Sequence, residues 1–131
     1  MKQFLRKLLG NHGEREAVRF LKKQGFRILQ KQYTNHVGEL DIVASEHDTI
    51  VFVEVKTRQS TNSGQPFEAV DLRKQHKLTQ VALEWLKRYR RLDQPARFDV
   101  VSIVWPADAQ TPEIQHFRNA FEASGRGQFF S

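Results

Sequence analysis

The 131-residue sequence contains no cysteine. This absence excludes disulfides, zinc–thiolate sites and thiol nucleophiles. Any bound metal must therefore be held by carboxylate, carbonyl, water or imidazole ligands. Oxygen ligands of this kind favour hard ions, so the expected cofactor of a metal site is Mg²⁺ or Mn²⁺.

Long apolar runs are also absent from the sequence. No stretch is long enough to span a bilayer, and the first residues, MKQFLRKLLGNHGER, lack the apolar core of a signal peptide. We therefore expect a cytoplasmic protein with no membrane partner. The length predicts a single domain over residues 1–131, with a core at about 10–121 and a loose tail at 122–131.

The charge balance is basic, with a formal net charge of +6 and a sequence pI near 9.9. Positive charge attracts polyanions, because each neutralised phosphate releases condensed counterions. Nucleic acid is the most common partner of this kind. A basic protein without a specific partner has the same composition, so the charge does not decide between the two.

Hydrophobic periodicity predicts an α+β fold in the order α-β-β-β-α-β, with helices packed on a mixed sheet. The predicted helices cover residues 13–23 and 71–91. Strands are expected at 26–33, 39–45 and 50–57 as an antiparallel meander, and at 97–105 inside the sheet. Residues 58–66 predict a polar loop, and residues 113–123 fit either a short strand or a helical turn.

The run IVFVEVK places charged residues in an otherwise apolar strand. Alternate residues of a strand share a face, so Phe52, Glu54 and Lys56 point one way and the three intervening valines point the other. A carboxylate and an ammonium in such a strand cost desolvation free energy. Stability alone therefore does not explain Glu54 and Lys56.

The preceding strand, GELDIVA, carries a second carboxylate. Its alternation predicts Glu39, Asp41 and Val43 on one face and Leu40, Ile42 and Ala44 on the other. If the turn EHDT pairs this strand with the next, Asp41 lies close to Glu54. Two adjacent carboxylates repel each other unless a cation lies between them, so the pair predicts a metal site.

The two helices supply further charged residues. Glu14 is on the core-facing stripe of the first helix, and Lys74 is in line with the buried stripe at the start of the second. The second helix also carries a basic face that includes Lys77. Such a face is by default solvated, and phosphate contact is an equally weighted interpretation.

These motifs in order, GNHGEREA, GELDIVA, VFVEVKTR, EAV with Lys74, and RFDVV, resemble the small bacterial YraN-like family (UPF0102) from about Gly10 to Val104. That family is similar to the restriction-endonuclease-like PD-(D/E)xK superfamily, in which archaeal Holliday-junction resolvases share the arrangement. The family pattern usually has Phe where this chain has Ser63 before Gly64.

The resemblance implies roles for individual residues. Asp41 and Glu54 would hold the metal, Lys56 would orient or help deprotonate the attacking water, and Glu14 would complete the acidic cluster. The predicted contacts to nucleic acid are Arg58, Lys74 and Lys77.

The resulting hypothesis is a metal-dependent endonuclease that hydrolyses DNA phosphodiester bonds, including those of branched or processed DNA. Two chains could associate as a homodimer to cut both strands. The alternative is a basic nucleic-acid-binding or partner-recruiting module that keeps the nuclease fold with little or no turnover. A lone Glu-x-Lys is more often a surface ion pair, so the metal hypothesis depends on Asp41 and Glu14 being present as well.

Overall fold

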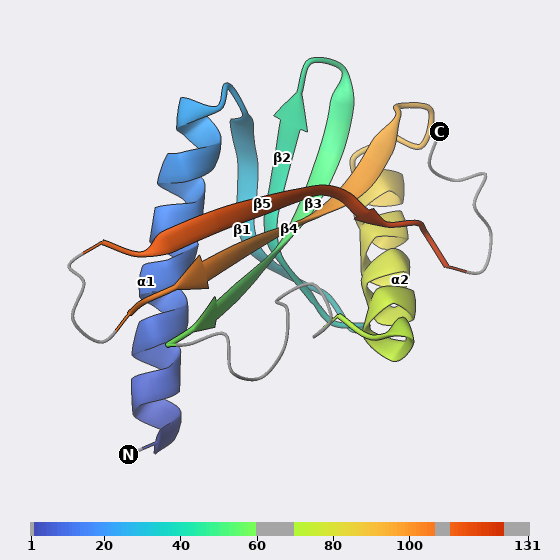
Figure 1. Ribbon diagram of the computed structural model, residues 1–131. Coiled ribbons are helices and arrows are strands. Elements are labelled where there is room, and N and C mark those ends of the chain that lie inside the picture. Colours follow the sequence, from blue (N-terminus) through green and yellow to red (C-terminus); the bar gives the residue numbers. More distant parts are fainter. Residues whose placement is uncertain (1, 60–69, 107–110, 125–131) are drawn as a thin grey trace.

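A computed structural model of the chain describes residues 2–59, 70–106 and 111–124. It shows a five-stranded mixed sheet with one helix on each face, as the predicted α+β class requires (Figure 1). Most of the predicted loop at 58–66 and of the predicted tail at 122–131 lies outside the described residues. Within the described residues, no helix is both long and apolar enough to cross a membrane.

The chain folds in the order α-β-β-β-α-β-β. Its elements are α1 (Lys2–Lys23), β1 (Arg27–Thr34), β2 (Glu39–Glu46), β3 (Thr49–Arg58), α2 (Leu72–Arg88), β4 (Ala96–Val104) and β5 (Glu113–Phe121).

Helix α1 starts eleven residues before the predicted start at Gly13. The added segment is rich in Lys, Leu, Gln and Arg, which have high helix propensity, and the helix continues through both Gly10 and Gly13. Helix α2 begins after Asp71, whose side chain accepts a hydrogen bond from the backbone N–H of Lys74. It ends slightly before the predicted residue 91.

The sheet order is β1-β2-β3-β4-β5. Strands β1, β2 and β3 form the predicted antiparallel meander, and β4 runs parallel to β3 because α2 connects them. The prediction that β4 lies inside the sheet is confirmed. Residues 113–121 pair antiparallel with β4. Of the two alternatives for this segment, a strand or a helical turn, the strand is therefore correct.

Apolar residues form one core on each face of the sheet. The core beneath α1 includes Ala17, Leu21, Ile42, Val53 and Ile103. The core beneath α2 includes Phe52, Leu78, Trp85, Phe98 and Val100. Figure 1 shows the two helices on opposite sides of the strands. The parts of the sheet that carry the charged residues are therefore held from both faces.

Strand β2 departs from the predicted alternation at Leu40. Leu40 packs in the core beneath α2 together with Val43, whereas Ile42 packs beneath α1. The prediction that Leu40 and Ile42 share a face is therefore wrong. On the neighbouring strand β1, Gln32 has a φ of 52°, and a left-handed residue of this kind kinks a strand locally. The kink lies beside Asp41.

Candidate active site

The site lies where β2 separates from β3. The last residue pair between these two strands is Ile42 with Val53. Beyond it, the side chain of Asp41 bridges the gap, because its Oδ2 accepts a hydrogen bond of 2.8 Å from the backbone N–H of Val55. The backbone of β3 therefore fixes the carboxylate of Asp41.

Glu54, in β3, is the second carboxyl of the site and is 8% exposed. Burial raises its pKa most, and a hydrogen bond with Asp41 and the charge of Asp41 raise it further. Lys74 and Lys56 act in the opposite direction, and the resulting pKa is about 8. At neutral pH the carboxyl of Glu54 therefore holds a proton, and it donates this proton in the hydrogen bond to Asp41.

Among the described residues, one oxygen of Glu54 has no hydrogen-bond partner. Oε2 is buried and accepts no hydrogen bond, although Nζ of Lys74 lies 3.5 Å from it. A cavity of about 10 Å³, the space of about one water molecule, is bounded by Asp41, Glu54 and Leu78 among others. The pair of carboxyls thus leaves acceptor capacity unused at this position.

Glu14, from α1, is the third carboxyl. Its pKa is raised, mainly by burial and next by the charge of Asp41, with a smaller contribution from Glu39. A hydrogen bond with Gln32 and the charge of Lys31 oppose this rise. The charge of Asp41 therefore acts on Glu14 as well as on Glu54.

Gly13 allows α1 to approach β3 closely enough for this convergence. A Cβ atom at Gly13 would overlap the side chain of Thr57. Only glycine therefore permits the observed separation of helix and strand. Glu14 is the next residue, so the contact sets the position of its carboxyl relative to Asp41.

A groove of about 690 Å³ opens in front of Asp41, and we call it the acidic groove. It is lined by Gly10, Asn11, Glu14, Gln32, Thr34, Glu39, Asp41, Val55, Lys56 and Thr57. Glu54 lies behind Asp41 on the side of α2, where it meets Lys74. Asp41 is thus the carboxyl shared by the groove and the buried pair.

Two of the four predicted basic residues lie at the site and two lie elsewhere. Lys56 lines the acidic groove, and Lys74 reaches Glu54. Arg58 is the last residue of β3 and does not line the groove. Lys77 is exposed on α2, where its methylene groups approach Gly38. Glu14, Asp41 and the Glu-x-Lys motif therefore come together, whereas Arg58 and Lys77 lie outside this cluster.

Gln32 and Glu39 belong to the site but were not among the predicted site residues. Gln32 lines the groove and hydrogen-bonds Glu14, and nothing in the sequence of β1 distinguishes it from other polar residues of an edge strand. Glu39 does carry a signal, because it lies two positions before Asp41 in the same strand.

In the described part of the chain, no group of three His, Asp or Glu residues is close enough to hold a metal ion alone. The carboxyls of Asp41 and Glu54 are nevertheless suitable ligands for a hard cation. Mg²⁺ commonly uses only one or two carboxylates and keeps water or phosphate oxygens at its other positions. The residues present fit such an ion.

Comparisons with known sequences all point to the same family. The profile described as "Uncharacterised protein family UPF0102" matches residues 13–103. A UPF0102 protein of Geobacter metallireducens is 47% identical over 116 residues, which cover 88% of this chain and 93% of that protein. One from Caldicellulosiruptor saccharolyticus is 44% identical over 113 residues, covering 86% of this chain and 96% of the relative.

A more distant relative, from Rhodopirellula baltica, is 38% identical over 125 residues, which cover 93% of this chain and 75% of the relative. The profile match includes Glu14, Asp41, Glu54 and Lys56, so the segment that forms the acidic cluster is part of the shared region. With most of its length matched in this way, the chain belongs to the UPF0102 family.

Proposed function

We propose that this protein is a metal-dependent phosphodiesterase that cleaves DNA, and that Asp41 and Glu54 hold the metal. The observation that carries the proposal is the buried carboxyl pair, in which the pKa of Glu54 is about 8. A pKa raised this far is unfavourable for stability at neutral pH. Such groups gather at functional sites, where binding of a cation restores the favourable state of both carboxylates.

Residues around this pair of carboxyls have different proposed roles. A divalent ion bound there would lower the pKa of a water molecule and withdraw charge from a phosphate. Lys56 lines the acidic groove, where its ammonium stabilises negative charge that develops on the phosphate oxygens. Glu14, with its raised pKa, accepts the proton of the attacking water at its carboxylate.

Lys74 has a role that depends on the state of Glu54. Its ammonium lies 3.5 Å from Oε2 of Glu54 and its side chain is 40% exposed. A cation held by Glu54 and Asp41 would repel the ammonium of Lys74, which could then turn toward solvent. Because Lys74 is partly exposed, it then reaches a phosphate of bound DNA.

The same ion pair favours a second candidate function. Lys74 occupies the free side of Glu54 and stabilises the site without a metal. A protein that retains this state would bind nucleic acid through its positive charge and turn over little or no substrate. The first candidate requires that a metal compete with Lys74 for Glu54, and the second requires that it fail to do so.

Cleavage of supercoiled plasmid and of a labelled four-way DNA junction separates the two candidates. We expect cleavage with Mn²⁺ or Mg²⁺, none in EDTA, and a loss of at least about 100-fold in Glu54→Gln, because the ligand is removed. Glu113→Gln is the matched control, since Glu113 is exposed at the start of β5 and the same substitution is made there away from the site.

Equal cleavage by the native protein and Glu54→Gln, or cleavage that persists in EDTA, would refute the metal-dependent assignment. DNA binding by a folded native protein without cleavage in either metal would favour the second candidate.

A further inference from the structure

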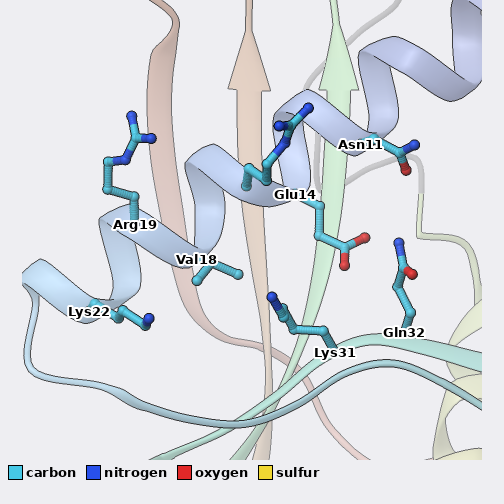
Figure 2. Close-up of a pocket in the computed structure, with 8 residues that line it drawn as sticks. Asn11, Glu14, Val18, Arg19, Lys22, Lys31 and Gln32 are labelled. Atoms are coloured by element: carbon cyan, nitrogen blue, oxygen red, sulfur yellow. The ribbon is translucent and has the colours of Figure 1, made fainter.

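A second groove, of about 560 Å³, lies between α1 and β1 and adjoins the acidic groove. Asn11, Glu14 and Gln32 line both grooves, so the two grooves are direct neighbours. Figure 2 shows Glu14 extending from α1 toward Lys31 and Gln32 of β1. A ligand in the acidic groove therefore meets the second groove at Glu14 and Gln32, which are hydrogen-bonded to each other.

This second groove is basic away from Glu14, and we call it the basic groove. Its charged lining residues beyond Glu14 are Arg15, Arg19, Lys22 and Lys31. Arg19 pairs with Glu16 at 3.1 Å. Among the described residues, no carboxylate lies within ion-pair distance of the other three cations. The lining therefore has a net positive charge: Arg15 and Lys22 have no carboxylate within ion-pair distance among the described residues, and the charge of Lys31 acts on Glu14.

The charges follow the axis of α1. Glu14, Val18 and Lys22 are four residues apart and lie in one line on the helix, with Lys22 about 12 Å from Glu14. In Figure 2, Lys22 and Lys31 extend toward each other beside Val18. A length of about 12 Å is enough for a short stretch of sugar–phosphate backbone.

We propose that the basic groove binds the sugar–phosphate backbone of the DNA strand whose reacting phosphate lies at Asp41. The inference rests on the proposed function for the position of the reacting phosphate, whereas binding in the groove requires no turnover. The gradient from the carboxyl of Glu14 to the ammonium groups of Lys22 and Lys31 favours this occupant. The phosphates of a polyanion are attracted to Lys22 and Lys31, and a metal ion would neutralise the negative charge near Glu14.

The test compares two double variants that lose the same charge. Lys22→Ala/Lys31→Ala removes one cation from each wall of the basic groove. Lys87→Ala/Arg90→Ala removes two exposed cations at the end of α2, on the opposite face of the sheet. Affinity for a labelled 20-base-pair duplex and for a labelled single strand is measured in EDTA across ~50–200 mM salt by fluorescence anisotropy. Thermal unfolding confirms that both variants are folded.

The groove variant is expected to bind DNA on the order of tenfold more weakly per lost contact near 0.1 M salt, with the slope of log K against log salt smaller by about 0.9 per contact. The control variant should change affinity less than about twofold. Equal weakening of both variants would mean that only net charge matters, and it would overturn the inference, as would unchanged binding by the groove variant or no DNA binding by the native protein.

Cleavage assays on the same preparations keep the two proposals separate. Groove-dependent binding without cleavage in any metal would leave the basic groove established and refute the phosphodiesterase. Metal-dependent cleavage together with unchanged binding by the groove variant would do the reverse.

Discussion

The sheet carries two clusters with a buried carboxyl group, and they differ in how that group is satisfied. One is the acidic cluster of Glu14, Asp41 and Glu54. The other lies on β4 and β5, where Asp99 is completely buried. Oδ1 of Asp99 accepts hydrogen bonds from Nε of Arg97 and the backbone N–H of Asn119, both at 2.9 Å. Both clusters place a costly group in the protein interior.

We call the second cluster the ionic network, formed by Asp99, Arg97, His116, Glu46 and Arg118. Oδ2 of Asp99 lies 2.7 Å from Nε2 of His116, and Arg97 also binds Glu46 at 2.9 Å. Burial acts to raise the pKa of Asp99, but hydrogen bonds from His116, Arg97 and Asn119 together outweigh it, and the pKa is lowered.

The comparison contrasts carboxyl groups whose pKa is lowered with a carboxyl group whose pKa is raised. In the ionic network each carboxylate has cationic partners, and the pKa of Glu46 falls to about 2, chiefly through its hydrogen bond with Arg118. In the acidic cluster the carboxyls face one another and the pKa of Glu54 rises to about 8. A raised pKa of a buried carboxyl lowers stability at neutral pH, and this cost is what the proposed metal would offset.

The largest expected effect is the loss of the central acid of the ionic network. Asp99→Asn leaves Arg97 and His116 without their buried carboxylate, and breaking a buried pair in this way costs about 3–5 kcal/mol of unfolding free energy. Urea unfolding at pH 7, with and without Mn²⁺, should show the same loss in both conditions. A loss under about 1 kcal/mol would show that the ionic network is not structural in this sense.

A smaller effect is expected where α1 approaches β3. Gly13→Ala forces a methyl group against Thr57 and should cost about 1–3 kcal/mol. Gly10→Ala is the matched control, because a Cβ at Gly10 meets nothing within 4 Å, and this change should stabilise the helix by up to about 1 kcal/mol. The opposite signs are measurable by thermal unfolding, and equal effects would contradict the described packing.

The pH dependence of stability distinguishes the clusters through Glu54. Its pKa rises from 4.5 in the unfolded chain to about 8 in the folded protein, so the folded state holds the extra proton between these values. Stability is therefore greatest below about 4.5 for this group and falls as the pH rises toward 8, by up to about 1.4 kcal/mol per pH unit.

Glu54→Gln should remove this slope, as measured by urea unfolding from pH 5 to 8. The ionic network has the opposite sign, because its carboxyl pKa values are lowered, and its contribution is lost as the pH falls below about 4.5 toward 2. An identical slope in the native protein and in Glu54→Gln would refute the raised pKa of Glu54.

The smallest expected change in stability is that of Asp41→Asn. Asparagine keeps an acceptor for the N–H of Val55 and removes a charge that repels Glu54 and Glu14. Stability in EDTA should therefore stay constant or rise. The increase in melting temperature on adding Mn²⁺ should shrink, because a ligand of the ion is lost. A large destabilisation in EDTA, with no response of the native protein to metal, would argue against the metal site.

Strand periodicity was sufficient to predict much of the acidic cluster. The alternation of IVFVEVK placed Glu54 with Phe52, and the structure puts both on the side of α2, where Glu54 meets Lys74. The helical stripe likewise placed Glu14 toward the sheet. These predictions succeeded because they depend on the geometry of a single element, which the local sequence determines.

Features that depend on two distant segments were not predicted. The left-handed Gln32 and the shifted face of Leu40 arise between β1 and β2, and no residue type there signals them. The sequence of β5 also does not predict the environment of His116, whose side chain is 8% exposed and lies 2.7 Å from Asp99 across the strand pair. The pairing of β4 with β5 produces this contact, so the sequence of either strand alone does not predict it.

The hydrogen bond from Val55 to Asp41 makes one side chain a member of the sheet as well as of the acidic cluster. Substitutions of Asp41 that would abolish the proposed activity therefore differ in their cost to stability. A relative that replaces Asp41 by alanine loses a backbone contact together with the carboxylate, whereas replacement by asparagine loses the carboxylate alone. If the proposed activity has been lost in a relative, asparagine should therefore occur at this position more often than any apolar residue.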